Sequence, residues 1–235
     1  MLLSKINNTF VNMAQHNKIL SVIPARKNSK RLKHKNRLLL NGVSLVGHCI
    51  MYAQKEMETD IVVSTDDEEI KAIAEQFGVK VLWRSQDLAD DYTSSAKVVQ
   101  DVALRIDGEY DYIALLQPSN PLRPKGLFKS SLKEMLKQEG QSLLTVSLNQ
   151  HKLGRIQDSI FHPITYEIGQ RSQDLKPTYF ENGLLYMTAF DLAKKGKILC
   201  QKPIALILDH PFSTVDIDTE LDFKWAEFIL NQYND

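Results

Sequence analysis

A dense group of basic side chains follows the first apolar run of the sequence. Residues 19–24 read ILSVIP, and the chain continues as IPARxxSKR and then Lys35-Asn36, with no acidic residue between positions 26 and 36. Arg offers paired donors to phosphate oxygens and Lys offers a point charge, so a loop of this kind directly after a strand predicts a triphosphate site. A solvated basic loop is the simpler alternative, but the position directly after IPAR favours the phosphate site. The loop lacks GxxxxGKS and GxGxxG spacing, which argues against a P-loop ATPase or a dinucleotide-binding protein.

Two carboxylates lie near the other end of the chain. Asp216 and Asp218 are one residue apart in VDIDTE, just before an expected helix. On an extended backbone the two side chains point to the same side, and hard oxygen ligands there could hold Mg²⁺ together with phosphate oxygens. The alternative makes Asp218 a turn residue and Thr219 a helix cap. Taken alone, the pattern favours neither interpretation.

Two further polar segments follow expected strands. Arg84 precedes a stretch of small and polar residues that ends at Ser95 and could contact the edge of a nucleotide base. Taken alone, this stretch is better explained as a capped loop with Ser94 as the helix cap. Gln117 follows the apolar run YIALL and could hydrogen-bond to sugar hydroxyls or to a carboxylate. A turn held by two prolines is the competing explanation, and Arg123 could cap a helix or pair with a carboxylate.

Alternating strands and helices would bring these segments together. Short apolar runs predict strands at 19–24, 60–65, 79–83, 112–116, 142–148, 183–187 and 203–208, and amphipathic patterns predict helices at 44–53, 94–106, 127–137 and 220–230. A capping box of Thr65 and Glu68 is expected to open another helix, which Gly78 would end. This alternation predicts a parallel sheet covered by helices on both faces, with ligands at the carboxyl ends of its strands.

Residues 151–176 interrupt the alternation. They lose clear periodicity and are rich in polar residues. A stretch of this length without regular structure inside a domain is usually functional or forms an interface. We therefore expect an insertion or a projecting arm.

The composition limits the classes of protein to consider. The chain has 235 residues, of which 43% are hydrophobic and 25% charged, and its 29 Lys and Arg balance its 29 Asp and Glu. This balance disfavours nucleic acid as a partner. Cys49 and Cys200 form no metal-binding or disulfide pattern. No signal peptide or apolar run of membrane-spanning length is evident, so a cytoplasmic location without membrane association is expected.

Taken together, the motifs resemble those of the CMP-sialic acid synthetases, or acylneuraminate cytidylyltransferases. The set consists of IPARxxSKR with KN, VVSTDDEEI, LLQPSNPLR, ENGLLYM and VDIDTELD, in that order from residue 19 to near the C-terminus. The resemblance implies transfer of CMP from CTP to the anomeric hydroxyl of N-acetylneuraminate or a related nine-carbon 2-keto acid, with release of pyrophosphate. It further implies Mg²⁺ or Mn²⁺ as cofactor.

The resemblance also implies a fold and an assembly. The fold is α/β, a three-layer αβα arrangement around a mostly parallel sheet, Rossmann-like and of the nucleotide-diphospho-sugar transferase type. Residues 19–235 would form this domain after an N-terminal extension, residues 1–18. An arm at about 149–180 would make a homodimer and reach into the sugar site of the neighbouring subunit.

Site roles carry over by motif. Catalytic roles fall to Arg26, Lys35 and Asp218, and the metal would lie on Asp216 and Asp218. Nucleotide contacts are implied for Arg26, Ser29, Lys35, Asn36, Arg84, Thr93 and Ser95, and sugar contacts for Gln117, Arg171 and Asn182.

One position departs from the family pattern. Many sialic acid members have Arg two residues before the Asn of the NG pair, where this chain has Phe180, and Glu181 stands beside Asn182. An acidic residue near the carboxylate of the sugar is unfavourable, so legionaminate or another relative is an alternative substrate, or Arg155 or Arg171 supplies the missing charge. Kdo (3-deoxy-manno-octulosonate) and a non-catalytic nucleotide-binding role are the remaining alternatives.

Overall fold

A seven-stranded sheet forms the centre of the protein. The computed structural model describes residues 17–233, so nearly all of the N-terminal extension expected at residues 1–18 lies outside the described residues. The strand order is β11-β7-β10-β6-β1-β4-β5. Within residues 17–233, no helix is both long and apolar enough to cross a membrane.

Four parallel strands make one half of this sheet. They are β1 (Ile19–Pro24), β4 (Asp60–Thr65), β5 (Lys80–Trp83) and β6 (Tyr112–Leu115). The other half consists of β7 (Ser142–Asn149), β10 (Thr178–Ala189) and β11 (Ile204–Ile207). Strand β10 runs antiparallel to both of its neighbours, so the sheet is mostly but not wholly parallel. The short pair β2 (Leu39–Leu40) and β3 (Val43–Ser44) lies outside it.

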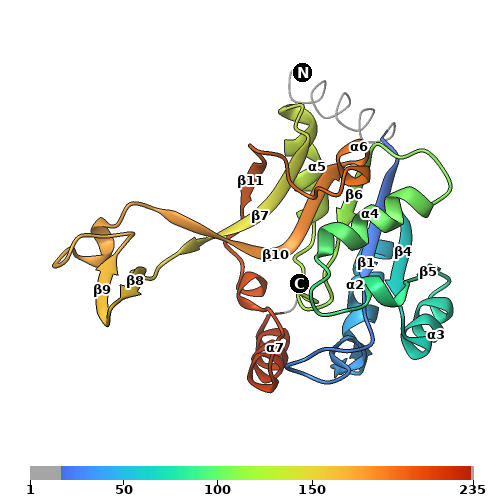
Figure 1. Ribbon diagram of the computed structural model, residues 1–235, viewed down its shortest axis with the longest axis horizontal. Helices are drawn as coiled ribbons and strands as arrows, with labels where there is room; N and C mark the ends of the chain where they lie inside the picture. The colour runs from blue at the N-terminus through green and yellow to red at the C-terminus, as the bar shows by residue number, and fades with distance from the viewer. Residues whose placement is uncertain (1–16, 234–235) are drawn as a thin grey trace.

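Helices cover both faces of the sheet, as expected from the alternation (Figure 1). One face packs against α2 (Leu45–Glu56), α3 (Glu68–Gln76) and α5 (Leu127–Lys137), and the other against α4 (Ser95–Arg105) and α6 (Phe190–Lys194). Strand β1 contributes side chains to the apolar core on each face of the sheet. Ile19 and Ile23 belong to the core under α2, α3 and α5, whereas Leu20 and Val22 belong to the core under α4 and α6. A strand buried on both faces needs apolar residues at nearly every position. The predicted three-layer fold is confirmed.

The last helix, α7 (Glu220–Gln232), closes a third, smaller core. Ala226 and Ile229 pack there against Phe212, Val215 and Ile217. Thr219 caps this helix, and its side chain and that of Asp222 form a reciprocal capping box. The cap fixes the chain direction just after the acidic pair.

Of the helix caps named from the sequence, Ser94 and Thr219 are confirmed and Thr65 is wrong. Ser44 and Ser94 cap α2 and α4 through their side chains. Helix α3 is capped by Asp67 instead of Thr65, because the Asp67 carboxylate accepts a hydrogen bond from the Glu69 N–H at 2.9 Å. The Thr65 hydroxyl accepts from the Asp67 N–H at 3.1 Å and so holds the capping residue in place.

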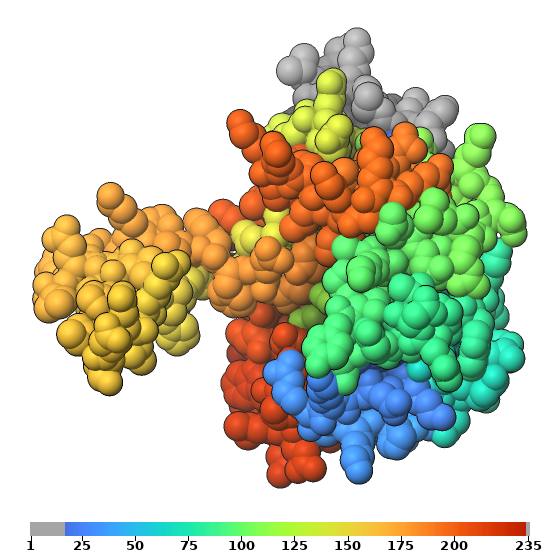
Figure 2. Space-filling view, viewed as in Figure 1, coloured from blue at the N-terminus to red at the C-terminus, as the bar shows by residue number. Residues whose placement is uncertain are grey.

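The region without periodicity forms an arm that projects from the body (Figures 1 and 2). Strands β7 and β10 lead into it, and its tip contains a hairpin of β8 (Gly154–Gln157) and β9 (Ile160–Pro163). The projection was expected from the sequence, but these two strands were not. The hairpin residues are largely exposed, so its strands carry no strong alternation between buried and exposed positions.

Strand β10 is irregular next to the end of β6. Its pairing with β7 shifts register between Glu181 and Tyr186, and Gly183 within this bulge has φ of +73°. A Cβ on Gly183 would lie 2.7 Å from Oδ1 of Asn120. The bulge therefore needs glycine both for its backbone conformation and for the close approach of Asn120.

Substitution at two glycines separates these effects. Gly183→Ala should lower the free energy of unfolding by more than Gly126→Ala, a matched control with the same φ of +73° and no atom within 4 Å of the point where a Cβ would lie. The left-handed conformation costs each variant about 1–2 kcal/mol, and only Gly183→Ala adds the clash with Asn120. Urea unfolding of both variants provides the measurement. Equal losses of unfolding free energy in the two variants would show that Asn120 moves away from the added Cβ without measurable cost.

Candidate functional site

A cleft of about 350 Å³ opens at the carboxyl ends of the parallel strands. Loops that follow β1, β5 and β6 form its walls, as expected for an open α/β sheet. Its lining includes Arg26, Ser29, Lys30, Arg31, Lys35, Asn36, Arg84, Asp91, Thr93, Ser95, Val98, Gln117, Ser119 and Asp218. The volume lies within the range of small-molecule binding pockets.

Two hydrogen bonds, one of them from a buried side-chain amide, hold the basic loop after β1. Asn36 is 6% exposed, and its Nδ2 donates to the backbone carbonyl of Arg26 at 2.9 Å. The backbone N–H of Lys27 donates to Oδ1 of Asp66 at 2.8 Å. These two bonds hold the loop after β1 in place, and its side chains Arg26, Lys30, Arg31 and Lys35 line the cleft.

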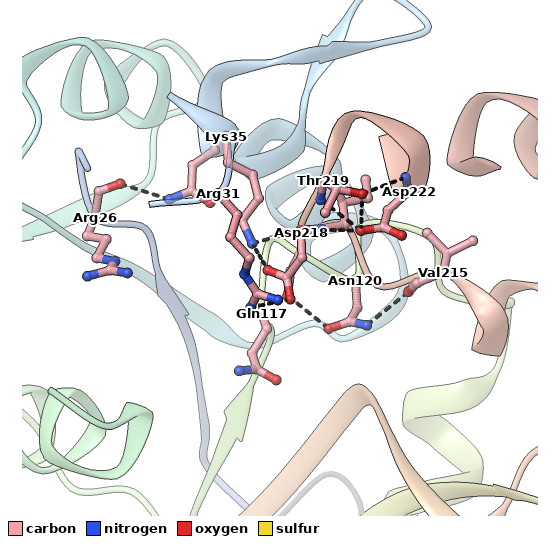
Figure 3. Close-up of polar contacts among 12 residues, drawn as sticks. Arg26, Arg31, Lys35, Gln117, Asn120, Val215, Asp218, Thr219 and Asp222 are labelled. Atoms are coloured by element: carbon pink, nitrogen blue, oxygen red, sulfur yellow. Dashed lines mark hydrogen bonds and ion pairs between the residues drawn. The ribbon is translucent and has the colours of Figure 1, made fainter. Parts of the chain in front are cut away.

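Asp218 joins the two ends of the sequence within this cleft. Lys35 donates to Oδ1 of Asp218 at 2.9 Å and to the carbonyl of Ile217 at 2.7 Å, and Arg31 pairs with Oδ2 of Asp218 at 2.7 Å (Figure 3). The backbone N–H of Asp218 donates to Oδ2 of Asp222 at 3.0 Å, which ties the backbone of Asp218 to the start of α7. The predicted meeting of the basic loop with the acidic segment is therefore present.

Asp216 lies close to Asp218 but is not part of the cleft lining. Burial, followed by the nearby charge of Asp218, raises the pKa of the Asp216 carboxyl, although a hydrogen bond with Ser119 and the charge of Lys35 act in the opposite direction. Ser119 itself lines the cleft. Two carboxylates that repel each other at the edge of a cleft fit a divalent cation, which favours oxygen ligands and would relieve the repulsion.

Protein groups alone would not complete such a cation site. Among residues 17–233, no group of three or more His, Cys, Asp or Glu side chains is arranged to hold a metal ion. A cation on Asp216 and Asp218 would therefore need oxygen ligands from a bound molecule or water, which is usual for Mg²⁺.

Asp91 pairs with the opposite side of the basic loop. Its carboxylate lies 2.6 Å from Nη1 of Arg26 and 3.2 Å from Nζ of Lys30. Arg26 also donates to the carbonyl of Asp90 at 2.9 Å. The pKa of the Asp91 carboxyl is lowered because these hydrogen bonds and charges outweigh its desolvation.

The wall between β5 and α4 supplies a buried cation and several small polar groups. Arg84 is 4% exposed and donates to the hydroxyl and the carbonyl of Ser64 at 3.2 and 2.8 Å. Burial lowers the pKa of Arg84 to about 10, and the charge of Asp66 partly offsets that effect. Thr93 and Ser95 lie on the same wall, and Ser95 accepts a hydrogen bond from Gln117 at 3.4 Å.

Most of the predicted site residues lie in the cleft lining, but three do not. Arg171 lies on the arm and pairs with Asp174, and Asp216 lies next to Ser119 at the edge. Asn182 is 4% exposed, and its side-chain amide bonds within the sheet to Thr145 and Ser147. Its side chain therefore supports the β10 bulge in this structure.

Other groups in the cleft were not predicted as site residues. Arg31, Asp91 and Ser119 belong to the motifs that the sequence analysis singled out, yet no spacing rule assigned them a role. Arg31 and Asp218 are 187 positions apart, so their pairing becomes visible only once the sheet has formed. The high number of basic residues in the loop was the one feature of the sequence that pointed to additional charged groups in the cleft.

A tyrosine and a glutamate lie beside the bulge of β10. The Tyr186 hydroxyl donates to Oε2 of Glu181 at 3.0 Å. Burial raises the pKa of Tyr186, and the charges of Glu181 and Asp216 raise it further. Glu181 and Asp216 therefore make this end of the site acidic, in contrast to the basic loop.

The chain matches a known family over most of its length. The family model described as cytidylyltransferase matches residues 20–214. Relatives include the CMP-N,N'-diacetyllegionaminic acid synthase of Legionella pneumophila, 34% identical over 91% of this chain and 96% of that protein. The N-acylneuraminate cytidylyltransferase of Escherichia coli is 31% identical over 92% of this chain, which spans 53% of that longer protein. The pseudaminic acid cytidylyltransferase of Campylobacter jejuni is 29% identical over 90% and 96% of the two chains.

Solved structures agree on the fold. A CMP:2-keto-3-deoxy-manno-octonic acid synthetase complexed with CTP superposes with a TM-score of 0.69 at 17% identity, over 92% of this chain and 99% of that chain. A 4-diphosphocytidyl-2C-methyl-D-erythritol synthase of Anaerococcus prevotii gives a TM-score of 0.68 at 13% identity, over 94% and 99% of the two chains. Together with the match to the family model, these likenesses lead to one conclusion: the chain belongs to the cytidylyltransferase family.

Proposed function

We propose that this protein transfers CMP from CTP to the anomeric hydroxyl of a nine-carbon 2-keto acid sugar and releases pyrophosphate. The observation that carries the proposal is the cleft in which Lys35 and Arg31 from the first loop meet Asp218 from the last. A polyphosphate needs several converging cations, and a cation bound to the phosphates needs a carboxylate beside them. The names of the relatives support a cytidine nucleotide as the donor and a nine-carbon acidic sugar as the acceptor.

The nucleotide would lie across the carboxyl ends of the parallel strands. Its phosphates would replace the carboxylates that now pair with Arg26, Lys30, Arg31 and Lys35. The cytosine would lie against the wall of Arg84, Thr93 and Ser95. Because Arg84 is buried and held by Ser64, it would present its remaining donors in a fixed direction.

Asp216 and Asp218 are the groups that would hold Mg²⁺ or Mn²⁺. The mutual repulsion of their carboxylates and their place beside the basic loop fit a cation shared with phosphate oxygens. When bound, the metal would supply charge stabilisation at the phosphates.

The chemistry is an in-line substitution at the α-phosphorus of CTP. The anomeric oxygen forms a bond to phosphorus, the bond from phosphorus to the oxygen of the leaving pyrophosphate breaks, and the hydroxyl proton passes to solvent or to a phosphate oxygen. Negative charge grows on the leaving group, where Arg26 and Lys35 would stabilise it. Preorganised charges of this kind commonly supply the largest catalytic contribution.

The sugar would lie beyond Gln117, with its own carboxylate directed away from Glu181 because like charges repel. Gln117 faces the cleft, and Glu181 and Tyr186 flank the bulge of the neighbouring strand. Legionaminate, pseudaminate and N-acetylneuraminate are the candidates supported by the relatives, and Kdo is the nearest alternative. CTP is a cytoplasmic metabolite, so we place the reaction in the cytoplasm.

Pyrophosphate release tests the function directly. The protein would be supplied with CTP, Mg²⁺ and each of these four sugars in turn. Release with a nine-carbon sugar is expected. Release with Kdo alone would favour the alternative substrate, and no release with any sugar despite CTP binding would favour a non-catalytic nucleotide-binding protein.

Two single substitutions test the charged centre. Lys35→Ala and Asp218→Ala should each lower kcat by about 10²–10³-fold, because each removes a charge fixed at the phosphates. Lys195→Ala, a substitution of a lysine outside the cleft lining, serves as the control and should keep full activity. Circular dichroism would show that the variants remain folded. Near-normal turnover in both would reject these roles.

Asp216→Asn should separate stability from activity. The raised pKa means that the folded state favours the protonated carboxyl, so the ionised Asp216 costs stability at neutral pH, and this cost fades as the pH falls through that pKa. With metal removed, the variant should unfold at a higher temperature than the native protein at pH 7, and the gap should narrow towards acidic pH. Turnover with Mg²⁺ should fall. A lower Tm at pH 7 would contradict the argument.

The arm supports a homodimer as part of the proposal. Its surface exposes Ile156, Ile160, Phe161 and Ile168, which are 77%, 61%, 48% and 84% exposed in the single chain. Exposed apolar patches on soluble proteins commonly mark interaction sites. A second copy of the chain is the proposed partner.

Solution mass tests the dimer. The native protein should have about twice the mass of one chain in light scattering, and Ile156→Glu should shift it towards the monomer, because a buried charge without a partner is costly. Leu104→Glu is the control, since Leu104 is 64% exposed on α4, far from the arm in the sequence. A native monomer would rule out this role for the arm.

A further inference from the structure

A buried amide lies directly behind the cleft. Asn120 is 2% exposed, and its Nδ2 donates to the carbonyl of Asn182 at 3.1 Å and to the carbonyl of Val215 at 2.9 Å. These carbonyls belong to segments 62 and 95 positions further along the chain. One side chain therefore joins the turn after β6 to the bulge of β10 and to the acidic segment, and Figure 3 shows Asn120 pointing towards Val215.

The oxygen of the same amide is also used. Ser119 donates to Oδ1 of Asn120 at 3.1 Å, and the Ser119 hydroxyl is also within hydrogen-bonding reach of Asp216. The bulge can come this close only because Gly183 has no Cβ. Both donors and the acceptor of the Asn120 side chain thus connect parts of the site.

Arg123 repeats this pattern from the other end of the turn. It is 6% exposed, and it donates through Nε to the carbonyl of Leu184 at 2.6 Å and through Nη2 to the carbonyl of Gln117 at 3.0 Å. Nη1 lies 3.3 Å from Sγ of Cys49. Asn120 and Arg123 together hold the bulge on both sides of Gly183.

The connected segments all belong to one half of the site. Gln117 and the bulge flank the proposed sugar position, and Val215 directly precedes Asp216. On the nucleotide wall, Arg84 and Thr93 are held by different bonds, to Ser64 and Asp90. A long bond of 3.4 Å from Gln117 to Ser95 joins this wall to the other half. A change at Asn120 should therefore act unequally on the two substrates.

We propose that Asn120 is a positioning residue that sets the spacing between the sugar-binding strand ends and the metal-binding carboxylates. The inference rests on the proposed function. Asn120 acts through backbone carbonyls and does not touch the reacting atoms. A shift of about 1 Å in such a constellation can cost about a hundredfold in rate, which is the scale expected when the bridge is removed.

Asn120→Ala and Asn120→Ser are the test variants. Calorimetric titration with CTP in the absence of both sugar and Mg²⁺ should give a dissociation constant within about twofold of the native value. By contrast, kcat/KM for whichever nine-carbon sugar the native protein uses should fall by about 10–100-fold, and the Mg²⁺ concentration for half-maximal rate should rise. This split between the substrates is the signature of positioning.

A matched control separates positioning from general destabilisation. Met135 is fully buried on α5 and belongs to the core of the sheet, so Met135→Ala should lower the Tm without touching the turn after β6. If this variant, at a comparable Tm, loses as much kcat/KM for sugar as Asn120→Ala, the inference is wrong. Equal losses of CTP affinity and sugar kcat/KM in Asn120→Ala would also overturn it.

Arg123→Lys provides a second route if Asn120→Ala does not fold. Lysine keeps the charge but lacks the planar fork that spans two carbonyls. In Arg123→Lys, CTP affinity should again stay near the native value while kcat/KM for the sugar falls, by less than in Asn120→Ala. Unchanged sugar kinetics would contradict the inference. Failure of the native protein to release pyrophosphate with any sugar would instead reject the proposed function itself, so the two failures are distinguishable.

Discussion

The pairing of Asp218 with Lys35 and Arg31 is the contact on which the site depends. It joins the first loop of the domain to the segment before its last helix, and both carboxylate oxygens take part. The Lys35 side chain is only 14% accessible, so screening of its pairing by water and salt is weaker than at the surface, whereas Arg31 is 68% accessible and its pairing is screened more strongly. Removing Asp218 would leave the sheltered charge of Lys35 without its carboxylate partner, which costs more than an exposed ion pair is worth.

The sheet explains why distant segments converge here. Strands β1, β4, β5 and β6 are parallel, so their carboxyl ends lie along one edge and their loops share one cleft. The antiparallel strand β10 reaches the same edge with its bulge instead of its end. The turn from Gln117 to Arg123 lies between these two parts and bonds to both.

The sequence was sufficient for the fold and for much of the cleft, because periodicity and strand-end position are local signals. The basic loop, Arg84, Ser95, Gln117 and Asp218 line the cleft as expected. Asn182 shows the limit: its side chain bonds to Thr145 and Ser147, and only the register of β7 and β10 determines that direction. The hairpin of the arm and the cap of α3 were missed for a local reason, since weak alternation and competing cap residues leave local patterns ambiguous.

The cations of the cleft are paired before any substrate arrives, and this has an energetic consequence. Asp91 holds Arg26 and Lys30, while Asp218 holds Arg31 and Lys35. A triphosphate entering the cleft would exchange carboxylate partners for phosphate partners, so the basic side chains would need little rearrangement and little loss of hydration. The two released carboxylates would then differ, because Asp218 would stay beside Asp216, where a divalent cation would neutralise both, whereas Asp91 has no such neighbour among the proposed metal ligands. Preorganised charge of this kind favours the transition state, because the cost of assembling it is met during folding.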